Sequence, residues 1–230
     1  SRLIADMVLE NVKAGARFSD HAVLYRMNAQ SGTVERALAK NAIPYRVIGG
    51  LRFYERKEIK DMLAYLTVLV NPADNLRLTR IINEPKRKIG AATVDAALEI
   101  SASLGIPLLD VLRQSEQFAA LSRAKAALDS FVDIIDNLTE LAENVSLDVL
   151  LEQVLELTGY RAMLEEQGLE GAARMENILE LKSNLMRYEQ ENPEEGLAGF
   201  LEEIALYTDV DNYDPDADAM VLMTIHSAKG

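Results

Sequence analysis

The feature that most constrains the fold of this chain is a long interior block without strand-like sequence, flanked by short strand-like runs. Between positions 55 and 215 the apolar residues recur at helical spacing, and no convincing strand pattern occurs. Short β-prone runs lie before this block, near residues 21–26 and 45–48, and another lies after it, near 219–225. This order predicts one α/β unit into which an all-helical unit is inserted.

The short elements at the start of the chain indicate a parallel sheet. Apolar side chains at residues 3–12 share one helical face, and a further helix is predicted at 31–42, where Pro44 stops it. Helix, strand, helix and strand follow one another with short connections, as in α/β proteins. The predicted fold is therefore mainly α. Residues 1–53 and 218–230 form a partial α/β unit, and residues 54–217 form a helical bundle.

The composition excludes several classes of site. The chain has no cysteine and two histidines, so disulfides and thiolate metal sites are excluded and little remains for a zinc site. The acidic segment at 209–218 lacks the central glycine and final glutamate of an EF-hand loop, so we expect no metal there. No apolar run approaches the roughly 18 residues of a membrane helix, and the first residues do not form a signal peptide. We expect a cytoplasmic protein.

Charge is distributed unevenly along the chain. Residues 1–90 contain 16 Lys and Arg against 9 Asp and Glu, whereas residues 91–230 contain 8 against 28. The first part could therefore face a polyanion while the rest forms an acidic body. Uneven surface charge without any function remains the alternative.

Nucleotide hydrolysis by these residues alone is not expected. The sequence contains no G-x-x-x-x-G-K-[ST] loop to hold phosphates, and no nucleophile–base pair stands out. We expect no catalytic residue and no bound cofactor in this chain.

Four polar segments are candidates for ligand contact. Residues 25–31 (Tyr-Arg-Met-Asn-Ala-Gln-Ser) follow a predicted strand, and Arg26 and Asn28 could contact phosphate or base, although Asn28 or Ser31 could simply cap a helix. Residues 49–61 interleave cations such as Arg52 with two aromatics, which suits a nucleic-acid strand or a helix start with Phe53 in the core.

The other two segments are a basic turn and a strand end. The turn comprises Lys86, Arg87, Lys88, Ile89 and Gly90, and a helix is predicted to begin near Thr93. It could hold phosphate, or it could be an exposed turn without a partner. The last ten residues deliver Thr224, His226, Lys229 and Gly230 at the end of a β-prone run, where α/β sheets bind their ligands.

Together these segments resemble the C-terminal half of a UvrD/PcrA-type superfamily 1 DNA helicase. The motifs that carry the resemblance occur in order along essentially the whole chain. They are Tyr-Arg-x-Asn-Ala-Gln-Ser, Pro-Tyr-Arg-Val-x-Gly-Gly-x-Arg-Phe-Tyr-x-Arg-x-Glu-Ile-Lys-Asp, Arg-Ile-Ile-Asn-x-Pro-Lys-Arg and Leu-Met-Thr-Ile-His-Ser-Ala-Lys-Gly. In that family a RecA-like motor domain, 2A, is interrupted by a helical domain, 2B. By analogy, 2A would comprise 1–53 and 218–230, and 2B would comprise 54–217.

The resemblance also implies roles for individual residues. Arg26, Asn28, Arg52, Thr224 and His226 match positions at or near the single strand, and residues 86–90 match a 2B turn that grips duplex DNA. Thr224, His226, Lys229 and Gly230 fall in the motif that couples the nucleotide cleft to the DNA track. The implied parent is a bacterial 3′-to-5′ helicase that uses ATP and Mg²⁺ at a single/double-strand junction. Its first motor domain and final motifs would lie outside these residues.

Two positions depart from the family pattern. The family usually has Arg-Gly-Ile-Gly at the basic turn, where this chain has Lys88 in place of the first glycine. The family also usually has an arginine after the serine of the first motif, where this chain has Gly32. Either change could weaken DNA contact.

A different class of function also fits the sequence. The acidic helical block could be an interaction module that docks a repair or transcription protein, with little DNA contact.

Overall fold

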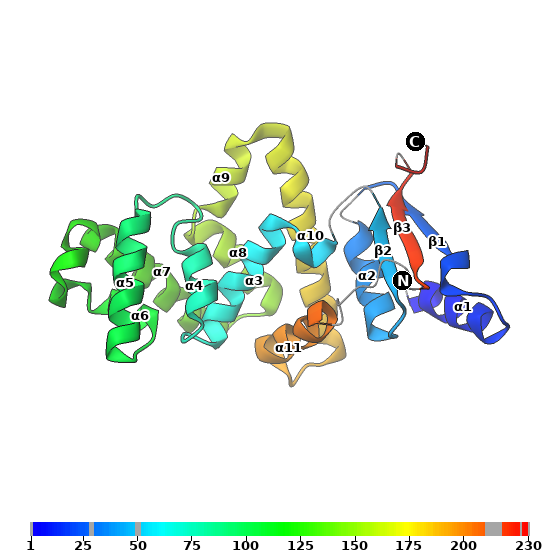
Figure 1. Cartoon of the computed structure of the whole chain (residues 1–230), viewed down its shortest axis with the longest axis horizontal. Helices are drawn as coiled ribbons and strands as arrows, with labels where there is room; N and C mark the ends of the chain where they lie inside the picture. The colour runs from blue at the N-terminus through cyan, green and yellow to red at the C-terminus, as the bar shows by residue number, and fades with distance from the viewer. Residues whose placement is uncertain (1, 28–29, 49–51, 210–217, 226, 230) are drawn as a thin grey trace.

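The computed structural model describes residues 2–27, 30–48, 52–209, 218–225 and 227–229, with the backbone alone at 2, 206–209 and 229. It comprises a small α/β unit, which contains the N-terminal elements and the last strand, and a larger helical body (Figure 1). Among the described residues, none of the helices has the length and apolar character needed to cross a membrane.

The α/β unit is built on a three-stranded parallel sheet. Its strands are β1 (Ala22–Tyr25), β2 (Tyr45–Ile48) and β3 (Met220–Thr224), in the order β1-β3-β2. Tyr25 is aligned with Thr224, and Ile48 is aligned with Met223. The strands predicted near 21–26, 45–48 and 219–225 are confirmed. The last of them is the central strand, so the sheet forms only when the chain returns from the helical body.

One face of the sheet packs against helices α1 (Arg2–Lys13) and α2 (Ser31–Lys40). The core beneath them contains Ala5, Val8, Tyr25, Leu38, Ile43, Met220 and Leu222. Alternate strand residues point to the opposite face, where Leu24 and Ile48 are exposed. Helix α2 ends two residues before the predicted position 42, because Ala42 adopts a left-handed conformation with φ of 52°.

The helical body is formed by nine α-helices of the described chain: α3 (Lys57–Val70), α4 (Asn75–Ile81), α5 (Ala91–Leu104), α6 (Leu108–Arg113), α7 (Lys125–Ala142), α8 (Leu147–Leu157), α9 (Tyr160–Glu166), α10 (Gly168–Glu191) and α11 (Gly196–Asp209). Residues that break helices follow three of them: Asn71-Pro72 directly after α3, Pro85 a few residues after α4 and Gly159 shortly after α8. No strand occurs among the described residues of this block, as predicted.

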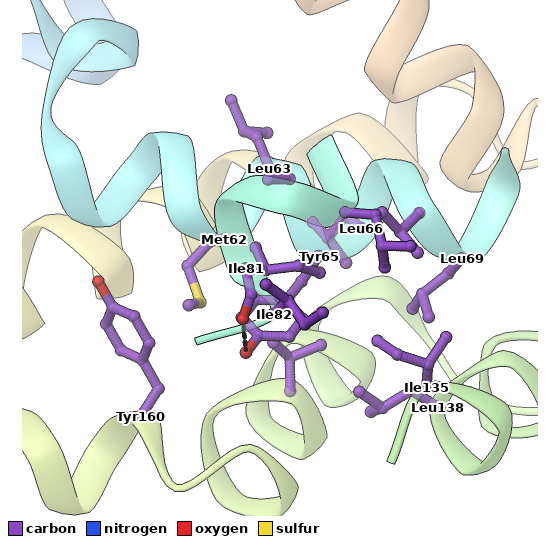
Figure 2. Close-up of a cluster of buried hydrophobic side chains, with 14 of the residues drawn as sticks. Met62, Leu63, Tyr65, Leu66, Leu69, Ile81, Ile82, Ile135, Leu138 and Tyr160 are labelled. Carbon is purple, nitrogen blue, oxygen red and sulfur yellow. Dashed lines mark hydrogen bonds between the residues drawn. The ribbon is translucent and has the colours of Figure 1, made fainter. Parts of the chain in front are cut away.

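Helix α3 lies at the centre of the helical body. Most of its residues are buried, and it packs against α4, α7, α8, α10 and α11. Figure 2 shows Met62, Tyr65 and Leu66 of α3 among side chains from the neighbouring helices, with a hydrogen bond of 3.4 Å from the Tyr65 hydroxyl to the Ile81 carbonyl. A helix that is apolar on nearly all sides must be enclosed, and these five helices enclose α3.

Candidate nucleic-acid interface

The carboxyl ends of β1 and β3 form one polar edge of the sheet. Thr224 ends β3 beside Tyr25, and the Ile225 N–H donates to the Tyr25 carbonyl at 2.9 Å. Arg26 follows directly, with an exposed side chain. The fold therefore brings together Arg26 and Thr224, which lie near opposite ends of the chain.

The turn after β1 is held by Gln30. Its side-chain oxygen accepts hydrogen bonds from the backbone N–H groups of Arg26, at 3.0 Å, and Met27, at 3.2 Å. These hydrogen bonds fix the backbone at Arg26 and leave its exposed side chain available at the surface. The candidate Asn28 lies outside the described residues.

Thr224 organises the turn that follows β3. Its hydroxyl oxygen accepts from the Ser227 N–H at 3.0 Å and lies 2.9 Å from the Ser227 hydroxyl. These contacts cap the short helical turn at Ser227–Lys229. The candidates His226 and Gly230 lie outside the described residues, as does the side chain of Lys229.

Arg52 lies at the start of the segment that leads from β2 into α3. Its guanidinium lies over the Tyr45 ring, 5.2 Å from the ring centroid, and donates to the Tyr45 carbonyl at 3.3 Å. The side chain is half-buried. Tyr45 of β2 therefore orients Arg52. Strand β2 lies next to β3, the strand that carries Thr224.

The three cations of the basic turn at 86–90 have different surroundings. Lys86 and Lys88 are exposed. Arg87 instead points into the protein, where it donates to the carbonyls of Ile81 and Pro85, each at 3.0 Å, and to the Thr158 carbonyl at 3.1 Å. It also donates to the Tyr65 hydroxyl at 2.8 Å.

The remaining contacts of Arg87 show that it supports the turn structurally. Its guanidinium lies 5.3 Å from the centroid of the buried Phe131 ring, and its backbone N–H donates to Asn83 Oδ1 at 2.7 Å. Burial raises the pKa of the Tyr65 hydroxyl to about 12, although Arg87 lowers it, so the hydroxyl stays protonated at neutral pH. The exposed groups of the turn are thus the two lysines.

The backbone of the same turn opens onto the start of α5. Lys88 has φ of 62°, and Ile89 is buried and anchors the turn. Gly90 precedes α5, no side chain caps this helix, and a Cβ at Gly90 would meet nothing within 4 Å. Uncapped N–H groups at a 14-residue helix, with two flanking lysines, can bind phosphate.

Gly32, the other departure, lies in a tight contact. A Cβ at this position would lie 2.8–2.9 Å from the ring of Phe53, which is fully buried. The absence of a side chain at Gly32 lets the ring pack against α2. The arginine that the family usually carries here could not be added without moving Phe53.

Arg56 is a buried arginine near this interface, and the sequence did not reveal its structural role. Arg56 precedes α3 and is 8% exposed, with hydrogen bonds to Ser31 Oγ at 2.7 Å and to Asn177 Oδ1 at 2.9 Å. The Asn177 amide in turn donates to Glu58 Oε1 at 2.6 Å. Arg56 therefore links the end of segment 25–31 to α10. The only sequence feature that indicated a role for Arg56 was its place in the basic and aromatic segment 49–61, which suits DNA contact and a helix start equally well.

No cluster of three or more metal-ligating side chains is found among the described residues. Asp218 of the acidic segment instead accepts from the backbone N–H groups of Phe18, at 3.0 Å, and Ser19, at 2.8 Å. The Ser19 side chain, together with these backbone N–H groups, lowers the pKa of the Asp218 carboxyl group. Asp218 thus fastens the start of β3 to the segment before β1.

Comparison with known proteins identifies clear relatives. A sequence model of the UvrD-like helicase C-terminal domain matches residues 1–230. The chain is 40% identical over 221 residues to the ATP-dependent DNA helicase PcrA of Bacillus subtilis, covering 93% of this chain and 30% of that protein. It is 38% identical over 226 residues to the ATP-dependent DNA helicase PcrA of Staphylococcus epidermidis, covering 97% of this chain and 31% of that protein. The chain thus spans under a third of the length of these relatives.

Proposed function

Because the chain belongs to the UvrD-like helicase C-terminal domain family, we propose that it works as part of an ATP-dependent DNA helicase. The α/β unit contributes contacts to the single strand, and the helical body contacts and regulates the duplex at the single/double-strand junction. The parent enzyme uses ATP with Mg²⁺ and moves in the 3′-to-5′ direction. Residues 1–230 alone do not hydrolyse ATP, because their sequence contains no phosphate-binding loop with its lysine.

The observation that carries the single-strand proposal is the shared edge of β1 and β3. Arg26 and Thr224 lie at adjacent strand ends, whereas the Arg52 guanidinium contacts Tyr45 at the start of the neighbouring strand β2. The carboxyl edge of a parallel sheet is the usual site for ligands in α/β folds. The exposed guanidinium of Arg26 contacts a phosphate, whereas Thr224 holds the helical turn Ser227–Lys229 through its hydrogen bond with Ser227. In the parent, that turn couples DNA contact to the nucleotide site.

The duplex contact is assigned to the basic turn before α5. Lys86 and Lys88 offer two exposed charges, and the uncapped start of α5 offers N–H groups. Contacts of this kind recognise the phosphate backbone rather than base sequence. Arg87 and Ile89 support the turn from inside, and Gly90 leaves room for close approach of a phosphate.

The test is a DNA-binding measurement at several salt concentrations. Fluorescence anisotropy is recorded for a labelled single strand and for a tailed duplex, with the wild-type chain, with Arg26→Ala, and with Lys86→Ala combined with Lys88→Ala. Each lost phosphate contact lowers the slope of log K against log salt by about 1. Arg26→Ala should weaken both ligands, and the double lysine variant should weaken only the tailed duplex.

The control removes two exposed cations elsewhere, Lys13→Ala with Arg123→Ala, which changes net charge equally. If the control and the turn variant lose the same affinity, binding follows net charge and the duplex assignment is wrong. Unchanged weak binding in all variants would instead favour a protein-docking role for the acidic body, whose residues 91–230 contain 28 Asp and Glu against 8 Lys and Arg.

A further inference from the structure

A cavity of about 580 Å³ lies between the two units, on the side where α2 runs beside α10 (Figure 1). Its wall contains three cationic side chains: Arg36 and Lys40 from α2, and Arg187 from α10. None of the proposed DNA contacts lines it. The cavity is therefore a separate feature of the molecule that the proposed function does not use.

Arg36 is the buried cation of this cavity. The residue is 4% exposed, and its Nε donates to Glu203 Oε1 at 2.8 Å. Its Nη1 reaches the Asn184 carbonyl at 3.5 Å, but its buried Nη2 has no hydrogen-bond partner among the described residues. Glu191 Oε2 lies 3.7 Å from Nη2. A buried guanidinium N–H without an acceptor is costly, so this donor is suited to a ligand.

The carboxylates of the cavity leave the cations incompletely paired. Glu191 lies 3.7 Å from Arg36 and 3.5 Å from Lys40, longer than the roughly 2.7–2.9 Å of a direct charge-assisted hydrogen bond. Its side chain is 47% exposed and can turn toward solvent. Arg187 makes no ion pair within the described part of the chain, and the second carboxylate, Asp6, is exposed. Glu203 pairs with Arg36 Nε from outside the cavity wall, so among the described residues Lys40 and Arg187 are the two cations of the cavity without a close acid.

We propose that this cavity binds a small phosphate-bearing anion that bridges α2 and α10. Guanidinium groups form paired hydrogen bonds to phosphate oxygens, and the lysine adds a third charge from the rim. The amides of Asn41 and Asn192 also line the cavity, and each donates to one backbone carbonyl and keeps a second N–H for the remaining oxygens. Because the ligand touches both units, its binding stabilises their present arrangement.

The cavity lies apart from the DNA contacts assigned above, and we assign it to a free anion. Helix α2 runs from Ser31, near the carboxyl edge of the sheet, to Lys40 at the opposite end. Ten helical residues span about 15 Å. A phosphate bound at Arg26 therefore cannot also contact Lys40, and this inference stands independently of the proposed function.

Titration with inorganic phosphate at constant ionic strength tests the site. Isothermal titration calorimetry compares the wild-type chain with Lys40→Gln combined with Arg187→Gln, and with Glu191→Gln. We expect the dissociation constant for phosphate to rise about tenfold or more in the double variant, since two charge-assisted contacts are lost. Glu191→Gln should lower it, because the competing carboxylate is removed. Arg36 is left intact, so that folding is preserved.

The control double variant, Lys13→Gln with Arg123→Gln, removes equal charge from exposed positions outside the cavity. Hydrogen exchange should also show phosphate-dependent protection at Lys40 and Glu191, the last residues of α2 and α10. Equal phosphate affinity in both double variants, or protection absent from these helix ends, would overturn the proposal.

A short oligonucleotide supplies the second arm of the experiment. It should leave the phosphate-dependent protection of α2 and α10 unchanged. If the oligonucleotide protects these helix ends itself and loses this effect in Lys40→Gln with Arg187→Gln, then backbone phosphate of DNA is the source and the free anion is excluded. A failure of Arg26→Ala to alter DNA binding would affect only the proposed function.

Discussion

At the scale of single residues, adjacent cations in the basic turn have opposite surroundings. Arg87 donates to carbonyls of Ile81, Pro85 and Thr158, whereas Lys86 and Lys88 are exposed. The sequence shows three consecutive cations and cannot tell which of them turns inward. That choice depends on Tyr65 and Phe131, which come from helices distant in the sequence.

We expect Arg87→Ala to lower the free energy of unfolding by about 2–4 kcal/mol, because several buried acceptors lose their donor. Lys86→Ala should change it by less than about 0.5 kcal/mol, as usual for an exposed side chain. Urea unfolding followed by circular dichroism measures both. Equal effects of the two substitutions would contradict a structural role for Arg87.

Lys88→Gly should stabilise the chain by up to about 1 kcal/mol. The φ of 62° at Lys88 strains a residue with a Cβ, and relief of this strain outweighs the extra entropy of glycine in the unfolded state. Lys86, which has no positive φ, provides the matched control, and Lys86→Gly should be neutral or destabilising. Thermal unfolding of the two variants tests this, since strain at position 88 requires a higher midpoint for Lys88→Gly and no rise for Lys86→Gly.

At the scale of elements, α2 is joined to the start of α3 by a contact that glycine permits. A Cβ at Gly32 would lie within 2.8–2.9 Å of the Phe53 ring. The helix at α2 and the turn before α3 could both be predicted from apolar spacing and proline stops. Their close approach could not, because Gly32 and Phe53 come from different elements and meet only in the folded chain.

Gly32→Ala is therefore expected to destabilise the chain by about 1–3 kcal/mol through overpacking. Gly90→Ala serves as the control, since a Cβ there meets nothing within 4 Å. The midpoints of urea unfolding should separate the two variants. Similar midpoints would show that Phe53 moves aside at little cost.

Glu35 of α2 also contacts Phe53, and it makes the free energy of unfolding depend on pH. Its carboxylate accepts from the Phe53 N–H at 3.0 Å and from the Tyr45 hydroxyl at 3.3 Å. Burial raises the pKa of Glu35 above 4.5, so the folded chain holds a proton that the unfolded chain releases. The stability associated with this proton is present below pH 4.5 and is lost as the pH rises through the folded pKa.

Glu35→Gln should consequently flatten the fall of unfolding free energy with pH above about 4.5. The measurement is urea unfolding at a series of pH values, with Glu55→Gln as the exposed control. A wild-type slope that persists in Glu35→Gln would assign the proton to another group.

At the scale of the whole molecule, polar contacts join the α/β unit to the helical body. Arg56 links Ser31 to Asn177, Thr33 donates to Glu180, and Arg36 pairs with Glu203. The two apolar cores lie on either side of these contacts. The division of the chain at 53/54 and 217/218 stays a prediction, and Phe53 itself packs into the larger core.

Arg56→Ala should loosen the α/β unit more than the helical body. We expect faster hydrogen exchange at β1 and β3 and unchanged exchange in α7, because the small unit loses its fastening while the large core keeps its own. Arg113→Ala, which breaks partly exposed ion pairs to Asp110 and Asp136, is the control and should change neither. Uniform acceleration across all helices would indicate a general loss of stability instead.

The sequence by itself determined the mainly helical fold, the three short strands, the helix stops and the membership of a helicase family. These follow from local spacing, from prolines and glycines, and from motifs that are contiguous in the chain. Only the tertiary structure decided that Arg87 and Arg56 turn inward, that Lys88 adopts a positive φ and that Arg36, Lys40 and Arg187 share a cavity. The physical reason is that burial and pairing of a charged side chain depend on partners distant in sequence, which folding alone brings into contact.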